Sequence, residues 1–200
     1  LASGPLARLT PPPLEARLGE TYAAQLQFAF PTCAGVEGQD ILHAFGDRLE
    51  DGMDSPFNIL VEAVEAPMVN AFALPGGRVL ITDDLIAEAQ TPDELAAVIA
   101  HEAAHVERRH VMQAVWRSLG LGLILDAVVG GGTGAGQQVV LLAGSVTELR
   151  YSRDAEAEAD ARGQEILQIL GFSSEGMAPF FRRLAGEDRR GERAAGVMEF

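Results

Sequence analysis

Residues 91–105 read TPDELAAVIAHEAAH, and they predict a helix that begins here and runs through about His110. Thr91 can cap this helix, Pro92 suits its first position, and Glu94 completes a capping box. Residues 95–100 are apolar on every side, which indicates a helix buried in the middle of the fold rather than on its surface. The polar residues that follow are therefore expected to be held rigidly.

Two histidines and a glutamate at helical spacing follow the apolar stretch. His101, Glu102 and His105 form the pattern H-E-x-x-H. Positions i and i+4 of a helix point nearly the same way, so both imidazoles can converge on one metal ion. Glu102 points to the neighbouring sector, where it can reach a water at the metal without taking a coordination site. The alternative is a chance pair of histidines, but the chain has only four, and this spacing in a capped, buried helix favours a metal site.

A hydrolytic zinc site needs a third protein ligand besides two histidines. His110 lies about 140° around a continuous helix from His105, so we expect it at the surface and outside the ligand set. Farther along the chain, Glu156 and Asp160 share one face of a second predicted helix. One carboxylate can bind the metal while the other orients a ligand histidine through its free N–H. The alternative, an exposed acidic helix face, is the interpretation we keep for Glu158, about 200° from Glu156.

The other segments predict an α+β fold that is mainly α-helical, with a small antiparallel β-sheet beside the histidine helix. Apolar residues recur at helical spacing in residues 39–49. Two strand-like runs, residues 57–64 and 69–82, are rich in β-branched residues, and a Pro-Gly-Gly turn interrupts the second. The apolar runs 119–129 and 139–146 are shorter than the roughly 20 residues that span a bilayer, so we expect buried or interfacial helices there.

The composition is that of a soluble domain, with 48% hydrophobic and 22% charged residues. The 15 basic and 29 acidic side chains give a net charge of −14, which argues against nucleic acid as a partner. Cys33 is the only cysteine, so no intramolecular disulfide can form. Residues 1–18 contain a triple proline and predict an extended lead-in segment, followed by one catalytic domain over residues 19–200.

Three motifs in the chain together resemble the CAAX prenyl protease and HtpX-like family of zinc metallopeptidases. Residues 70–77 read NAFALPGG, residues 93–98 read DELAAV and lead into the H-E-x-x-H pattern, and residues 152–160 read SRDAEAEAD. The resemblance covers about residues 58–185, with the motifs in the family's order. Three linked motifs are far more specific than one.

The resemblance implies a zincin-like fold and a zinc-dependent endopeptidase of protein quality control. By that resemblance His101, His105 and Glu156 hold one Zn²⁺ per chain. Glu102 is implied to activate water, and Asp160 to support His101. The family also holds the substrate backbone along an edge strand. The substrate-binding residues implied here are Asn70, Ala71, Phe72 and Ala73.

Soluble periplasmic members are the closer analogy, because the chain lacks the long spanning helices of integral-membrane relatives. This analogy implies the bacterial cell envelope and allows a peripheral membrane contact. Family members commonly continue past the point that matches Phe200, so we interpret the chain as a catalytic domain that further segments can follow. The sequence leaves the oligomeric state open, as it does the oxyanion-stabilising group, for which Tyr151, Arg153 and His110 are candidates.

Two other functions compete with proteolysis. A chaperone-like module would hold unfolded polypeptide on its edge strand and rarely cleave it, with the apolar runs 119–129 and 139–146 as further binding surface. A purely structural zinc site is disfavoured, because such sites fill all four positions and prefer cysteines. The chain offers only Cys33.

Overall fold

Helix α5 (Pro92–Glu107) runs through the centre of the fold, as its apolar first half predicts. The computed structural model describes residues 3–118, 151–175 and 177–183. Every residue of α5 from Ala96 to Val106 is buried. At the start of the helix, the Thr91 hydroxyl accepts a hydrogen bond from the Glu94 N–H at 3.3 Å, as predicted. The Glu94 carboxylate accepts in turn from the N–H of Gln90, at 2.8 Å, and also interacts with the backbone N–H of Thr91.

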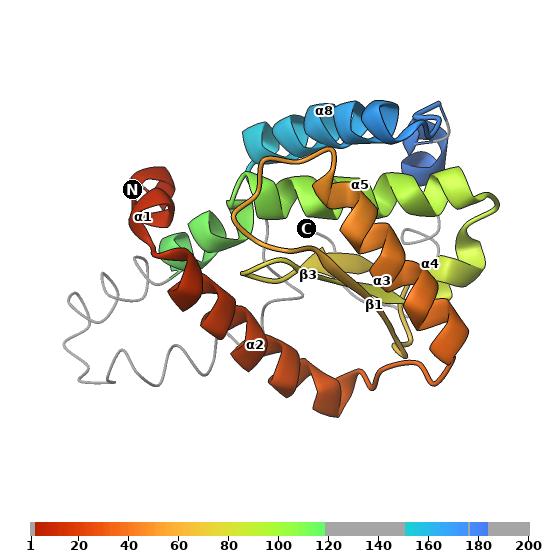
Figure 1. Ribbon diagram of the computed structural model, residues 1–200, viewed down its shortest axis with the longest axis horizontal. Coiled ribbons are helices and arrows are strands. Elements are labelled where there is room, and N and C mark those ends of the chain that lie inside the picture. The colour runs from red at the N-terminus through yellow and green to blue at the C-terminus, as the bar shows by residue number, and fades with distance from the viewer. Residues whose placement is uncertain (1–2, 119–150, 176, 184–200) are drawn as a thin grey trace, which may run out of the picture.

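A three-stranded sheet packs beside α5 (Figure 1). It consists of β1 (Leu60–Val64), β2 (Ala71–Ala73) and β3 (Arg78–Thr82), in the order β1-β3-β2. β2 and β3 are antiparallel around the predicted turn, but β1 runs parallel to β3. The sheet is therefore mixed, and the prediction of an antiparallel sheet is wrong for the β1–β3 pair. The reason is that β3 inserts between β1 and β2, which successive strand-like runs do not reveal.

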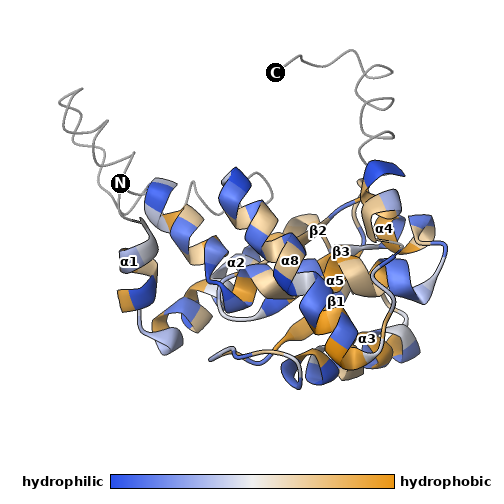
Figure 2. Cartoon of the chain, turned by 90° about the horizontal axis from the view of Figure 1, so that it is seen from above, coloured by the Kyte–Doolittle hydropathy of each residue, from blue (hydrophilic) through white to orange (hydrophobic). Residues whose placement is uncertain are grey.

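The alternation of side chains along β3 divides the apolar core in two. Val79 and Ile81 face the larger core, which lies between the sheet and three helices, α3 (Val36–Glu50), α5 and α8 (Arg153–Leu170). Leu80 faces the smaller core, formed with α2 (Pro12–Ala29) and the helical residues 110–118. Hydrophobic residues gather on the strands and on α5 accordingly (Figure 2). A short helix, α4 (Asp83–Glu88), joins β3 to α5.

The N-terminal residues are helical, so the prediction of an extended lead-in over residues 1–18 is wrong for the described part. Helix α1 (Ser3–Leu9) is followed directly by α2. Pro11 is the residue before the first turn of α2, and prolines occupy the first turn itself, where a missing N–H breaks no helical hydrogen bond. Tyr22 of α2 is buried in the smaller core. The division at residue 18 falls inside α2, and a single domain over residues 19–200 stays a prediction.

Helix α8 lies along α5 and brings a second set of polar side chains to it (Figure 1). It begins after Ser152, whose hydroxyl accepts from the Ala155 N–H at 3.2 Å, and it ends at Leu170, before Gly171 in the left-handed region at φ 79°. The close approach of the two helices depends on Gly163. A Cβ there would lie 3.2 Å from the backbone Cα and N of His101, so a larger residue would push α8 away from the histidines.

The apolar runs 119–129 and 139–146 lie outside the described residues. Residues 177–183 are helical and bury Phe180. Among the helices that the structure describes, none is long and apolar enough to cross a bilayer.

Candidate metal centre

Three side chains bring their donor atoms together between α5 and α8. The Nε2 atoms of His101 and His105 are 3.1 Å apart. Oε2 of Glu156 lies 3.4 Å from the first nitrogen and 3.8 Å from the second. Both histidines are buried, whereas the Glu156 side chain is 47% exposed, so the centre opens to solvent on the side of α8. The two imidazoles lower the pKa of Glu156 to about 2, which keeps it ionised.

The spacing of these donor atoms fits a zinc ion. In a tetrahedron with bonds of about 2.0–2.2 Å, neighbouring ligand atoms lie about 3.3–3.6 Å apart. The three observed separations, 3.1, 3.4 and 3.8 Å, scatter around that range. Two imidazole nitrogens with one carboxylate oxygen are also a donor set of open catalytic sites, which keep the fourth position for water or substrate.

Glu102 lies on the same helix but reaches toward the sheet. Its Oε2 accepts a hydrogen bond from the Ala73 N–H at 3.0 Å. Burial raises the pKa of Glu102 to about 7, against smaller opposing effects of His101 and of the Ala73 hydrogen bond. A carboxyl group with a pKa near neutrality suits a general base, because it can both accept and return a proton near neutral pH.

Asp160 stands beside the other nitrogen of His101. Its Oδ1 lies 3.0 Å from His101 Nδ1, one helical turn beyond Glu156. That nitrogen is buried and makes no well-aligned hydrogen bond among the described residues, so the contact is close but not fully formed. Burial lowers the pKa of His101, yet the carboxylates of Glu156, Glu102 and Asp160 outweigh it and the net shift is upward.

Asp160→Ala is expected to weaken zinc affinity about 10- to 100-fold, the usual effect of losing a group that orients a ligand histidine. The physical reason is the 3.0 Å approach of Asp160 Oδ1 to His101 Nδ1, which places the carboxylate where it can accept the N–H of a zinc-bound His101. Zinc affinity is measured by competition with a chromophoric chelator. Asp154→Ala, on the same helix and without a contact to either histidine, is the matched control. Equal zinc affinity in the wild type and Asp160→Ala would contradict the role.

His110 is buried, with 3% of its surface exposed, so the prediction of a surface position is wrong. Helix α5 ends at Glu107, Arg109 adopts the left-handed conformation at φ 56°, and residues 110–118 form a new helix. This break turns His110 back toward the metal centre, and its Nδ1 lies 3.0 Å from Nδ1 of His105. The pattern did not signal the break, because left-handed residues are usually glycine or asparagine.

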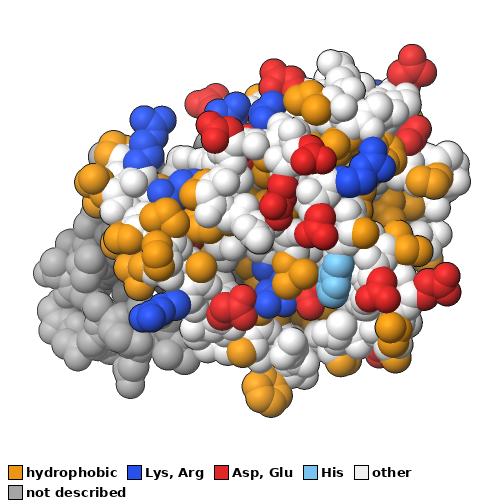
Figure 3. Space-filling view, in the orientation of Figure 1, with side chains coloured by type: hydrophobic (Ala, Val, Ile, Leu, Met, Phe, Trp, Pro, Cys, Tyr) orange, Lys and Arg blue, Asp and Glu red, His pale blue; other side chains and the backbone are white. Residues whose placement is uncertain are grey.

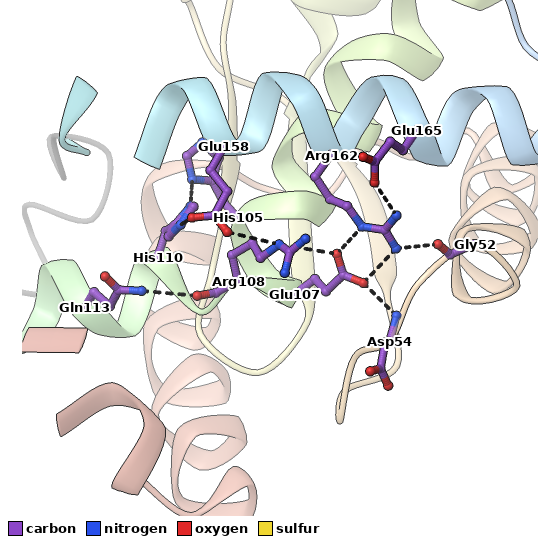
Figure 4. A network of polar contacts seen from close by, with 10 residues as sticks. All are labelled: Gly52, Asp54, His105, Glu107, Arg108, His110, Gln113, Glu158, Arg162 and Glu165. Carbon is purple, nitrogen blue, oxygen red and sulfur yellow. Dashed lines mark hydrogen bonds and ion pairs between the residues drawn. The ribbon is translucent and has the colours of Figure 1, made fainter. Parts of the chain in front are cut away.

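Glu158 is half exposed, yet its interpretation as a purely solvated side chain is also wrong. Its Oε2 lies 3.4 Å from Nε2 of His110, and its Oε1 lies 3.3 Å from Nε of Arg108 (Figure 4). The break after Glu107 places His110 beneath this part of α8.

Two aromatic contacts at the centre were missed by the sequence reasoning. The Tyr151 ring stacks on the ring of His105, with centroids 3.9 Å apart and planes at 17°. Phe181 meets the ring of His101 edge-on at 5.5 Å. Neither residue lies within a recognisable motif, so the sequence offers Tyr151 only as an oxyanion candidate and does not single out Phe181.

The four residues implied to bind substrate are Asn70 and the three residues of strand β2 that follow it. This strand is an edge of the sheet, but the Phe72 side chain is buried in the smaller core and the Asn70 carbonyl accepts from the Thr82 N–H at 3.0 Å. The Ala73 N–H is turned away from β3, toward Glu102. The Ala71 N–H is engaged by Asn70 Oδ1 at 2.9 Å and Ala73 is buried, so a substrate strand that used these main-chain groups would have to displace existing contacts.

Comparison with known proteins shows the family. The family described as Peptidase family M48 matches residues 37–196. The chain is 30% identical to a putative beta-barrel assembly-enhancing protease of Vibrio cholerae, over 86% of this chain and 38% of that protein. It is 32% identical to the mitochondrial metalloendopeptidase OMA1 of Saccharomyces cerevisiae, over 77% of this chain and 44% of that protein. The chain spans about two-fifths of the length of the first curated relatives it matches.

Proposed function

The chain belongs to peptidase family M48, the family that its three sequence motifs resemble, and we propose that it is a zinc-dependent endopeptidase. The observation that carries the proposal is the convergence of the His101, His105 and Glu156 donor atoms on α5 and α8. Glu102 lies on the same helix as the histidines, buried and outside the set of three donors. A site with three protein ligands and an adjacent base is built for hydrolysis rather than for structural support.

The proposed reaction is the hydrolysis of an internal peptide bond. A zinc ion held by His101, His105 and Glu156 would lower the pKa of a bound water to about 7 and polarise the scissile carbonyl. Glu102 accepts the proton of the attacking water and then donates it to the leaving amine. Burial raises the pKa of Glu102, whereas the charge of a bound zinc ion would lower it and favour the carboxylate form that the first transfer needs.

The edge of β2 is the proposed binding site for the substrate backbone. Ala73 donates its N–H to Glu102, so the outer edge of β2 lies directly beside the proposed base. An extended peptide that adds to this edge would pass across the Glu102 carboxylate. Recognition through main-chain groups makes few demands on the substrate side chains, which favours unfolded polypeptides with exposed backbone.

Protein quality control in the bacterial cell envelope is the proposed setting. Two of the relatives are named beta-barrel assembly-enhancing proteases, from Vibrio cholerae and Escherichia coli. Hydrophobic side chains gather over α1 and the start of α2 (Figure 3), where Leu6, Leu9 and Leu14 are exposed. A peripheral membrane contact would form on this surface.

Removal of the metal tests the proposed reaction. We expect the purified protein to cleave casein, to stop when a zinc chelator is added, and to resume when Zn²⁺ is restored, because the metal would supply both the activation of water and the polarisation of the carbonyl. Cleavage products are followed by gel electrophoresis and zinc content by elemental analysis. Cleavage that survives complete zinc removal would refute the proposal. A zinc-loaded protein that binds casein without cleaving it would favour the chaperone-like alternative.

A further inference from the structure

The ring of His105 is fixed by groups other than the zinc-binding set. Its Nε2 faces His101 and Glu156. One face of the ring stacks on Tyr151, with centroids 3.9 Å apart. Its other nitrogen, Nδ1, lies 3.0 Å from Nδ1 of His110. His105 is only 1% exposed, so this nitrogen depends on a protein partner rather than on bulk water.

Metal binding by His105 determines which ring nitrogens of His105 and His110 carry a proton. If Nε2 holds the metal, the single proton of the neutral imidazole is on Nδ1. That N–H then donates to His110 Nδ1, which must be unprotonated, so the proton of His110 is on Nε2. The Nε2–H of His110 is directed to Glu158 Oε2 at 3.4 Å. All donors and acceptors are matched in this one arrangement.

We propose that His110 and Glu158 position His105 for metal binding, His110 by accepting its Nδ1–H and Glu158 by fixing the His110 tautomer. The proposal rests on the zinc site proposed above and adds two positioning residues to it. His101 has a carboxylate, Asp160, beside its Nδ1. His105 has a histidine in the equivalent place, with a carboxylate one step farther away.

The break between α5 and residues 110–118 is held by contacts that make this arrangement stable. The left-handed region is unfavourable for a non-glycine residue, and Arg109 adopts it at φ 56°. Its guanidinium donates to Glu15 Oε2 at 2.9 Å and to the Thr10 carbonyl at 2.7 Å, so α2 and the segment before it anchor the break. On an unbroken helix His110 would point about 140° away from His105.

Substitutions of His110 separate positioning from simple packing. His110→Leu fills much of the same space but accepts no hydrogen bond, and we expect it to weaken zinc affinity about 10- to 100-fold. His110→Asn keeps an acceptor oxygen near the place of Nδ1 and should recover most of that loss. Zinc affinity is measured by chelator competition, and the thermal unfolding of the metal-free proteins reports any loss of packing.

Glu158 provides the second test, on a half-exposed side chain whose replacement does not threaten the fold. Glu158→Ala is expected to weaken zinc binding several-fold, and Glu158→Gln to restore it, since the amide oxygen still accepts from His110. Asp154→Ala on the same helix removes one negative charge without touching His110 and should bind zinc as the wild type does.

The outcomes distinguish this inference from the proposed function. Weaker zinc binding by His110→Leu and Glu158→Ala, with recovery in His110→Asn and Glu158→Gln, supports the positioning role. Wild-type zinc affinity in His110→Leu or, if that variant does not fold, in Glu158→Ala overturns it while leaving the zinc site intact. Absence of zinc binding by the wild-type protein overturns the proposed function itself.

Discussion

Glu102→Gln is expected to keep its zinc and its fold while losing peptide hydrolysis by roughly a hundredfold to ten-thousandfold, the usual contribution of a positioned base. The substitution removes the proton acceptor without changing the shape of the side chain. The amide oxygen of glutamine can still accept the Ala73 N–H, which is the hydrogen bond that Glu102 makes at 3.0 Å. The measurement is kcat on a fluorogenic peptide, with zinc content determined on the same sample.

The control for this variant is Glu37→Gln, an identical substitution at an exposed position of α3, which should behave as the wild type. Zinc loss in Glu102→Gln would show that Glu102 supports the metal rather than the proton transfer. Unchanged turnover with zinc present would mean that another group accepts the proton. Either result would remove Glu102 from the role of base.

The parts of the site that sequence predicts are those encoded locally. The helix over residues 91–105 follows from its capping residues and its apolar run, and H-E-x-x-H places two imidazoles on one face of it. Glu156 and Asp160 were identified because they share a helix face and a family motif. The structure places both carboxylates beside the His101 ring, through the close packing of α8 at Gly163.

The parts that sequence did not predict depend on tertiary contacts. The left-handed conformation of Arg109 is paired with Glu15, a residue of a different helix far away in the chain. Without that partner in view, residues 105–110 read as one continuous helix, and His110 was assigned to the surface. The parallel direction of β1 likewise depends on which strands become neighbours. The strand-like residues themselves do not encode this choice.

The proline run shows a local signal with two meanings. Consecutive prolines favour extended polyproline structure in a free chain, but a proline is also well tolerated in the first turn of a helix. Tyr22 and Leu26, one turn apart on α2, are buried against the sheet. Burial of this apolar face decides between the two meanings, and it is visible only once the sheet is formed.

Glu156→Ala should abolish zinc binding at concentrations that saturate the wild type, because it removes one of the three donor side chains that converge among the described residues. The loss must exceed the roughly 10- to 100-fold expected for groups that merely orient a ligand, so Glu156→Ala should bind zinc more weakly than Asp160→Ala and His110→Leu. Its side chain is 47% exposed, so the truncation leaves no buried cavity and the metal-free protein should stay folded.

Comparison of Glu156→Ala with Glu156→Gln and Asp154→Ala distinguishes ligation from charge. Glutamine removes the charge but retains a weak oxygen donor, so its zinc affinity should fall between those of the wild type and the alanine variant. Asp154→Ala removes the same charge from the first turn of α8 and should retain full affinity. If all three variants lose affinity equally, the acidic helix attracts zinc only through its overall charge, and the two histidines must find their third ligand elsewhere in the chain.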